Sequence, residues 1–169
     1  FPGFIYKSDP LYPEGGWKDV YALPDGTLYY QGQEYRDLFY ESSVDGGINA
    51  PDNGILIPRA ELADRLLEYT YRLGLSGFES NEFNEFWVPH LSAIDAPYFL
   101  FSILDEEEKQ RVDAVTITPE PDTFIYFLAY FEPVYEWYQP EPLILPEEPP
   151  ERVGFTAVEW GGTLAQPHK

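Results

Sequence analysis

Apolar side chains recur at helical spacing in one part of the chain, residues 58–90. Separated by steps of four, three and four, the recurring residues are Leu62, Leu66, Tyr69 and Leu73. This spacing puts side chains on one face of a helix, where a core can bury them. The pattern therefore predicts a helix over about residues 60–74, with Gly74 as its natural stop.

A second helix is predicted directly after the first. Ser76 and Glu79 form an S-x-x-E capping box, in which each side chain satisfies a backbone N–H of the first helical turn. Pro89 ends or kinks a helix because it lacks a backbone N–H. We therefore expect this helix to cover about residues 77–88.

Strand and turn patterns occupy the chain on both sides of the helices. Pro24-Asp25-Gly26 is a turn signal that predicts a hairpin between its flanking segments. The segments with strand composition are 17–23, 27–31, 35–44, 55–57, 98–104, 114–118, 123–131 and 153–160. Both faces of 123–131 are apolar, so this strand belongs inside a sheet. The summed pattern predicts an α+β fold with a largely antiparallel sheet and two adjacent helices on one face.

The same pattern predicts the domain organisation. Prolines and a glycine pair surround a short apolar piece in residues 1–16, which we expect to be an extended arm. Residues 17–162 are expected to form a single α+β domain, because 169 residues suit one core better than two. Within it, 133–151 is rich in proline and glutamate and reads as a surface loop. Residues 163–169 are expected to be a flexible tail.

Charge narrows the classes of partner. Thirty Asp and Glu stand against ten Lys and Arg, which gives a net charge of -20 at pH 7. Such a chain repels phosphate backbones and anionic membrane surfaces, so nucleic-acid binding is not expected. The longest apolar runs fall short of the roughly 20 residues that span a bilayer, so membrane insertion is not expected either.

The first residues suggest where the protein is found. The sequence begins Phe-Pro-Gly and contains neither methionine nor cysteine. A start without methionine indicates processing, and signal-peptide cleavage is its commonest form. We therefore predict an extracellular or cell-surface protein; the alternative is a piece cut at a domain boundary.

Cofactor motifs are scarce. A dinucleotide-binding glycine pattern, a phosphate-binding loop and zinc-ligand spacing are all missing, so no cofactor is expected. The turn-rich segment 45–54 offers one alternative, because Asp45, Asn49, Asp52 and Asn53 carry oxygen ligands suited to calcium. An ordinary turn rich in Asp and Asn is the competing interpretation.

Carboxylates that lie beside aromatic residues suggest a catalytic alternative. Glu41, Glu82, Glu85 and Glu159 are the candidates. Two carboxylates that face one cleft could hydrolyse a glycoside, provided that they lie about 5 to 10 Å apart. The competing interpretation is a solvated acidic face over an aromatic core, which we favour because the chain holds so many carboxylates.

Aromatic residues suggest a binding role. Tyr29, Tyr30, Tyr40, Trp137 and Tyr138 fall on predicted strands or in the proline-rich loop. Exposed tyrosine and tryptophan carry binding energy towards carbohydrate or protein. Burial in a twisted sheet is the alternative for the tyrosines.

Several sequence blocks resemble a group of bacterial surface or secreted proteins that has no settled activity. The blocks are PDGTL at 24–28, LFYE at 38–41, NEFNEFWVP at 81–89, PEPDT at 119–123 and RVGFTAVEWGG at 152–162. The resemblance implies a single extracytoplasmic module. It also nominates Glu41, Glu82, Glu85, Glu159 and Trp160 as functional positions, without implying a mechanism.

The sequence as a whole favours a secreted, acidic, non-enzymatic protein of the cell surface or extracellular matrix, with a structural or binding role. Its expected partners are other copies of itself, another extracellular protein or a polysaccharide. Self-assembly would use edge strands or the arm of residues 1–16. The alternative is a small carboxylate-dependent hydrolase, or a carbohydrate-binding module, that acts on polysaccharide.

Overall fold

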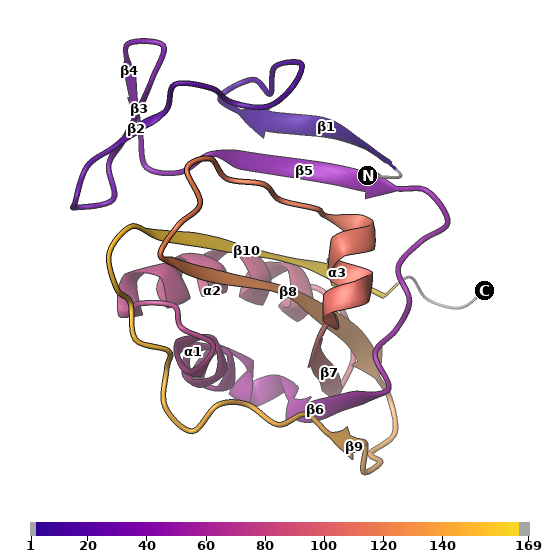
Figure 1. The fold of residues 1–169 in the computed structure, drawn as a ribbon. Helices are drawn as coiled ribbons and strands as arrows, with labels where there is room; N and C mark the ends of the chain where they lie inside the picture. Colours follow the sequence, from indigo (N-terminus) through magenta and orange to yellow (C-terminus); the bar gives the residue numbers. More distant parts are fainter. Residues whose placement is uncertain (1–2, 166–169) are drawn as a thin grey trace. The chain divides into compact units, whose positions relative to one another are not determined.

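A computed structural model describes residues 3–165 of the protein (Figure 1). The chain divides into two compact units: unit 1 comprises residues 1–48 and 111–113, and unit 2 comprises residues 49–110 and 114–169. The sequence predicts one domain over 17–162. In the described part of the chain the strands instead form three separate sheets, and no sheet takes strands from both units.

Unit 1 contains two small antiparallel sheets. Its strands are β1 (Gly3–Asp9), β2 (Tyr21–Ala22), β3 (Leu28–Tyr30), β4 (Gln33–Tyr35) and β5 (Phe39–Val44). Strand β1, which lies in the predicted arm, pairs with β5, and the other three strands form a meander. The predicted hairpin between β2 and β3 is present, closed by a bond of 2.8 Å from Leu23 N–H to the Thr27 carbonyl. The expected strand over 35–44 is divided between β4 and β5.

Unit 2 is built on a five-stranded sheet. Its strands are β6 (Asn53–Pro58), β7 (Tyr98–Ile103), β8 (Thr123–Val134), β9 (Glu141–Pro142) and β10 (Thr156–Leu164), in the order β10-β8-β7-β6-β9. Strand β7 runs antiparallel to both β6 and β8, whereas β10 is parallel to β8 and β9 is parallel to β6. The α+β fold class is confirmed, and β8 has a neighbour on each side, as its two apolar faces predict.

Several strands differ from the prediction in their bounds, and one predicted strand is missing from the described residues. Strand β8 continues to Val134, and β10 passes through its glycine pair to Leu164, inside the expected tail. The rest of that tail, residues 166–169, lies outside the described residues. Residues 114–118 alternate between more and less exposed positions but form no strand. Alternation alone does not make a strand when no neighbour offers hydrogen bonds.

Two helices cover one face of this sheet. They are α1 (Leu62–Arg72), which follows a 3₁₀ turn at Arg59–Glu61, and α2 (Gly77–Ser92). The capping box is present: Glu79 N–H donates to Ser76 Oγ at 3.2 Å, and Ser76 N–H donates to Glu79 Oε2 at 2.6 Å. Helix α2 continues beyond Pro89 because the last turn buries Leu91 and the Pro89 carbonyl still accepts from Ala93.

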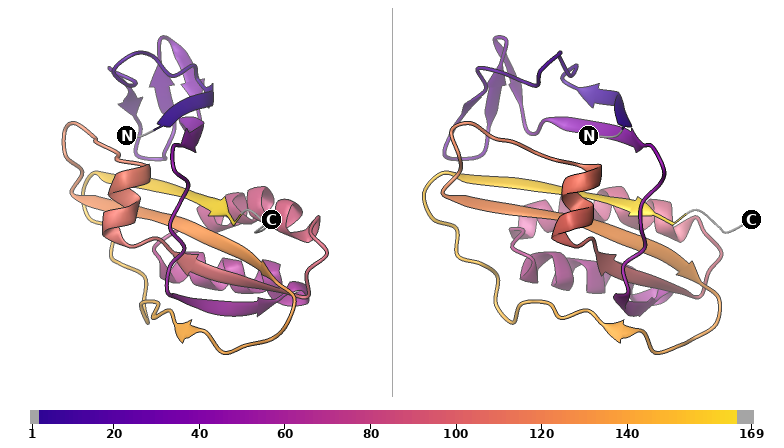
Figure 2. Two further views of the ribbon diagram at one scale, coloured as in Figure 1. Left: turned by 90° about the vertical axis from the view of Figure 1, so that its right-hand side faces the viewer. Right: turned by 45° about the vertical axis from the view of Figure 1, so that its right-hand side comes forward.

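A short helix, α3 (Glu106–Val112), lies over the other face of the sheet (Figure 2). Its Lys109 donates to the carbonyl of Tyr126, on β8, and places its Nζ 4.3 Å from the centre of that ring. The acidic helix α3 therefore has one side held against the sheet.

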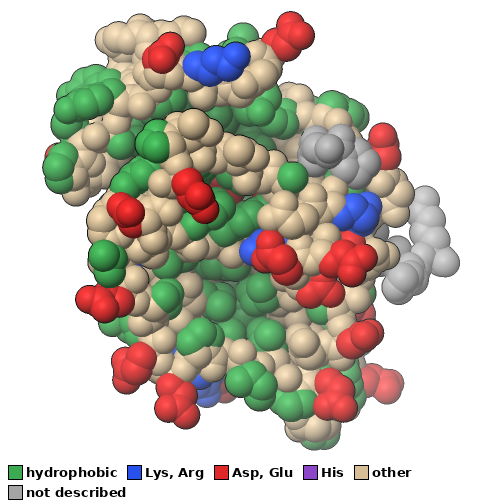
Figure 3. Space-filling model, in the orientation of Figure 1, with side chains coloured by type: hydrophobic (Ala, Val, Ile, Leu, Met, Phe, Trp, Pro, Cys, Tyr) green, Lys and Arg blue, Asp and Glu red, His purple; other side chains and the backbone are tan. Residues whose placement is uncertain are grey.

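Acidic side chains clearly outnumber basic ones on the face that Figure 3 shows. The few cations of unit 2 are engaged within the fold. Among the described residues of unit 2, the basic side chains and their contacts are Arg59 with Asp95, Arg65 with Glu61 and Glu68, Arg72 with Glu68 and the Pro146 carbonyl, Lys109 with Glu106, and Arg152 with Glu79. The excess negative charge of this unit is therefore not balanced from within.

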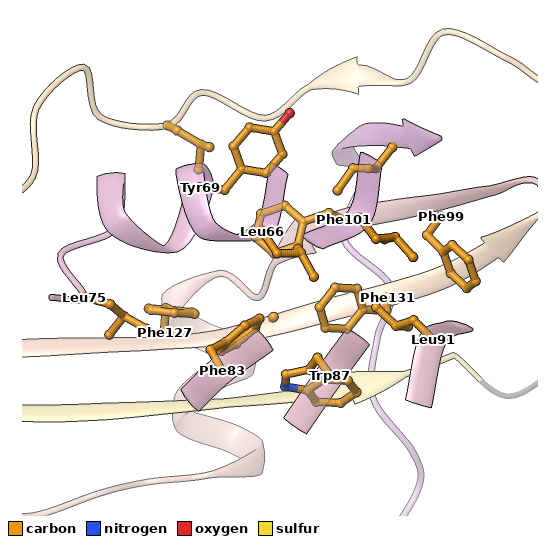
Figure 4. Close-up of a cluster of buried hydrophobic side chains, with 14 of the residues drawn as sticks. Leu66, Tyr69, Leu75, Phe83, Trp87, Leu91, Phe99, Phe101, Phe127 and Phe131 are labelled. Carbon is orange, nitrogen blue, oxygen red and sulfur yellow. The ribbon is translucent and has the colours of Figure 1, made fainter. Parts of the chain in front are cut away.

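The main core of unit 2 is aromatic and lies between the sheet and the two long helices (Figure 4). Odd-numbered residues of β7 and β8 supply the sheet side, among them Phe101 and Phe131, whose ring centres are 5.7 Å apart. Phe83 of α2 is fully buried, with its ring centre 5.9 Å from that of Phe127. Burial of such rings is the main contribution that fixes the helices on this face.

Candidate functional site

The segment that follows β8 carries two exposed aromatic side chains, Trp137 and Tyr138. Trp137 has 65% of its surface exposed and Tyr138 has 42%. Together they line a shallow, open groove of about 220 Å³. The other lining residues are Gly54, Ile55, Leu56, Gln139, Pro140 and Pro142.

Pairing of β9 with β6 forms this groove. Asn53 lies opposite Glu141 and Gly54 lies opposite Pro142, so the chain returns along the edge of β6 directly after the aromatic pair. The return holds Trp137 and Tyr138 beside the backbone of residues 54–56. Two residues that are distant in sequence from β6 therefore become its neighbours.

Gly54 is required at its place in the groove. A Cβ atom at this position would lie 2.4 Å from Leu100 Cδ1 and 3.1 Å from the carbonyl oxygen of Phe101. The first distance is far inside van der Waals contact, so any side chain would push β6 away from β7. The glycine keeps the two strands close and leaves this side of the groove without a side chain.

Glu132 sets the electrostatics beside the groove. Burial and the negative charge of Glu132 both raise the pKa of the Tyr138 hydroxyl. The pKa of Tyr130 is raised by burial, by the charge of Glu132 and by a hydrogen bond to it. Both shifts mean that one carboxylate lies close to two tyrosines, on the face of β8 that bears its even-numbered residues.

The groove has the chemistry of a binding site for a ligand that is not anionic. Its lining includes two aromatic rings, prolines and one amide side chain, and it contains no Lys, Arg or His. Apolar walls with few polar groups are typical of ligand sites. An anion would meet the field of Glu132 with no cation in the lining to offset it.

The predicted binding tyrosines lie in unit 1, and each already has a partner. Tyr29 donates to Glu34 at 3.1 Å, and the buried Tyr30 accepts from Gln31. The hydroxyl of Tyr40 donates to Asp113, with Oδ2 at 2.8 Å. Of the predicted aromatic residues, Trp137 and Tyr138 line one groove together, whereas Tyr30 lines a separate open pocket within unit 1.

Trp160 is partly buried and packs against the core. Its ring centre lies 5.2 Å from that of Phe83, in an edge-on arrangement, and it packs against the buried cluster. The position that the sequence blocks nominate for function therefore has a structural role in joining β10 to α2.

The candidate carboxylates lie on three different elements, and none of them lines the groove of Trp137 and Tyr138. Glu82 and Glu85 lie on α2, and Glu159 lies on β10 next to Trp160. Successive residues of a strand point to opposite faces, and Trp160 faces α2, so Glu159 points to the face away from α2. Glu41 belongs to unit 1.

Glu41 is engaged by neighbours on β1. It accepts from Lys7 Nζ at 2.7 Å and from the Tyr6 hydroxyl at 2.9 Å. The bond to Glu41, with a smaller effect of burial, raises the pKa of Tyr6. This arrangement ties β1 to β5 across the two-stranded sheet.

The candidate calcium ligands fall in both units of the chain, and two of them are engaged in other hydrogen bonds. Asp45 belongs to unit 1, whereas the other three belong to unit 2. Asn49 donates to Glu108 from its backbone at 2.6 Å and from Nδ2 at 3.0 Å, and Asn53 Oδ1 accepts from Ser102 at 2.9 Å. Asp52 belongs to no metal-binding group of acidic side chains, since residues 3–165 contain no group of three acidic or histidine side chains placed to hold a metal ion. Calcium binding gains no support from this geometry.

Sequence reasoning missed the opposite wall of the groove. Residues 54–56 read as the end of a turn and a short strand, and nothing local links them to Trp137. The only usable signal was the alternation of Pro140 and Pro142 after the aromatic pair, which favours an extended segment beside a sheet edge.

These features define an acidic α+β protein with an exposed aromatic groove at one edge of its main sheet. Within the described residues, no helix combines the length and the apolar composition needed to cross a lipid bilayer. Comparisons with protein-family models, with curated proteins and with solved structures give no match. The resemblance of the sequence blocks to bacterial surface proteins therefore stays a prediction.

Proposed function

We propose that the chain is a non-enzymatic binding protein that takes its ligand in the groove of Trp137 and Tyr138. The observation that carries the proposal is the exposure of both rings in a single groove. Tryptophan and tyrosine dominate binding energies because they bury a large area at a low cost in side-chain entropy. The two rings also lie next to each other along the chain, so one ligand can contact both.

Binding is a better proposal than hydrolysis because of where the carboxylates lie. Glycoside hydrolysis uses two carboxyl groups about 5 to 10 Å apart across the substrate. Glu159 points to the face of the sheet away from α2, which carries Glu82 and Glu85. Glu159 therefore cannot form such a pair with Glu82 or Glu85 across one face of the sheet, and none of the four candidates lines the groove.

An extracellular or cell-surface location belongs to the same proposal. Its support is the resemblance of the sequence blocks to surface proteins. Antibody labelling of intact and permeabilised source cells tests it: labelling that requires permeabilisation would contradict a surface location.

The groove is tested by a panel of neutral oligosaccharides and short peptides, with the indole N–H signal of Trp137 followed by NMR in the parent chain and the affinity of each variant measured by calorimetry. We expect at least one ligand to shift this signal, and Trp137→Ala or Tyr138→Ala to weaken its binding by about tenfold or more. Tyr71→Ala is the matched control, because Tyr71 is 52% exposed but lies on α1, away from the groove lining. Ligands that bind equally well to all these variants would show that the groove is not the site.

A second candidate function, self-assembly, rests on β1. Among the described strands β1 pairs only with β5, and its Phe4 and Tyr6 are 61% and 59% exposed. An edge strand with exposed aromatic residues can pair with the same strand of another copy.

A further inference from the structure

The exposed face of Trp137 suits a positive charge. The indole ring is the best aromatic partner for a cation, and arginine uses such rings more often than lysine. The chain already contains this type of contact, with Lys109 Nζ 4.3 Å from the ring centre of Tyr126 and Lys7 Nζ 4.9 Å from that of Phe39.

Carboxylates lie on both sides of the aromatic pair. Glu136 directly precedes Trp137, Glu141 lies on β9 between two prolines of the lining, and Glu132 acts on Tyr138. The basic residues of the described part of unit 2 contact carboxylates and carbonyls elsewhere, as given above. The region around the groove therefore has a negative potential that a cationic ligand would relieve.

The openness of the groove indicates the size of the ligand. Sites for free small molecules usually enclose most of the ligand surface. This groove is shallow, and Trp137 remains largely exposed within it. Such a shape fits one side chain of a larger partner, whose remaining contacts lie outside the groove.

On the basis of the proposed binding function, we infer that the groove takes an arginine or lysine side chain of a basic peptide, with its cationic group over the Trp137 ring and within reach of Glu132, Glu136 or Glu141. The inference deepens the proposed function by naming the class of ligand. Arginine is the preferred residue, because its planar guanidinium group stacks on indole and binds carboxylates at the same time.

The test compares two peptides that differ in charge alone. One is an acetylated and amidated glycine peptide with a central arginine, and the other replaces that arginine with citrulline, its uncharged isostere. Both are titrated into the complete chain at about 0.15 M salt, with the dissociation constant measured by calorimetry for every variant and the Trp137 indole signal followed where the residue is present. We expect the arginine peptide to bind at least about tenfold more tightly than the citrulline peptide.

Protein variants make the readout specific. Trp137→Ala should abolish the difference between the two peptides, and Glu132→Gln should reduce it several-fold at nearly unchanged side-chain shape. Tyr71→Ala, the control outside the groove, should leave it unchanged. Binding of the arginine peptide that survives Trp137→Ala would reflect general attraction to a charge of -20 and would overturn the inference.

The remaining outcomes separate the inference from the proposed function. If both peptides bind equally and both lose binding in Trp137→Ala, the groove is a ligand site but not a cation site. If neither peptide binds while a neutral ligand of the panel does, the inference again fails and the proposed function stands. If no ligand of either series depends on Trp137, both are wrong.

Discussion

Arg152 donates from Nη1 to Glu79 Oε1 at 3.0 Å, across 73 positions of sequence. The same guanidinium also donates to the other oxygen of Glu79 and to the carbonyl of Gly74. Glu79 closes the capping box at the start of α2, and Gly74 ends the turn after α1. One side chain that precedes β10 therefore fixes the connection between the two helices.

We predict that Glu79→Gln lowers the free energy of unfolding by about 1–2 kcal/mol at neutral pH, since it removes the charge that Arg152 faces but keeps a capping side chain. Burial alone would raise the pKa of Glu79, but the bonds from Arg152 and Ser76 hold it below its ordinary value of 4.5. The contribution of this carboxylate is therefore complete above that value and is lost as the pH falls through the lower pKa of the folded state.

Urea unfolding at about pH 7 and about pH 3 checks this prediction. The difference between the parent chain and Glu79→Gln should be largest at the higher pH and should shrink on acidification. Glu85→Gln, an exposed position on the same helix, should show little effect at either pH. A pH-independent effect of Glu79→Gln would mean that the ion pair is not its cause.

Truncation of Trp160 should lower the free energy of unfolding much more than truncation of Trp137. Trp160→Ala removes the ring that packs on Phe83 and should lower the free energy of unfolding by about 2–4 kcal/mol. Trp137→Ala removes an exposed ring and should change it by no more than about 0.5 kcal/mol. Thermal or urea unfolding of the two variants measures both values. A stable Trp160→Ala variant would contradict the structural role given to this residue.

Gly162 should tolerate no side chain, because β10 passes close to α2 at this point. A Cβ atom there would lie 2.7 Å from Trp87 Cζ2 and 3.0 Å from the carbonyl oxygen of Ala129. We expect Gly162→Ala to cost about 1–3 kcal/mol, because neither a buried ring nor a backbone oxygen can move freely.

Gly77→Ala is the matched control for this prediction. Gly77 is the first residue of α2, and nothing lies within 4 Å of a Cβ atom added to it. Alanine also restricts the unfolded chain, so this variant should be neutral or slightly more stable. Equal losses in the two variants would show that the approach of Trp87 to Gly162 does not matter.

Self-association should depend on pH if β1 pairs with β1 of another copy. Acidification from about pH 8 to about pH 3 neutralises carboxylates and so weakens the repulsion between chains of net charge -20. We expect light scattering to show assembly at the acidic end, and Tyr6→Lys to suppress it by placing a charge on the edge strand. Phe78→Lys is the control, because Phe78 is equally exposed but lies on α2. A monomer at every pH would remove the second candidate function.

Local patterns predicted the helices and the fold class well. The spacing from Leu62 to Tyr69 fixes one face of α1, and Ser76 with Glu79 marks the start of α2 within one turn of sequence. The apolar faces of residues 123–131 correctly indicated a strand with neighbours on both sides. Each of these signals comes from residues that are adjacent in both the sequence and the fold.

Long-range pairing was the part that could not be predicted. Nothing near Thr156 shows that β10 runs parallel to β8. The pair Gly161-Gly162 indicates the end of a strand in the sequence, whereas in the structure the strand continues and Trp87 packs close to Gly162. The groove is a similar case. Trp137 was identified as an aromatic residue in a proline-rich segment. The opposite wall of the groove, at Gly54, depends on β9, a strand of two residues.

The pairing of β10 with β8 also determines when folding can finish during synthesis. Strand β10 is the last described strand to leave the ribosome, yet it covers one edge of β8 and brings Trp160 against Phe83. Until residue 164 has emerged, a nascent chain would carry a long aromatic strand with one open edge. Contacts of such large sequence separation form slowly, and open edges are prone to aggregation. We therefore expect the nascent chain to depend on chaperone protection of β8 until residue 164 has left the ribosome.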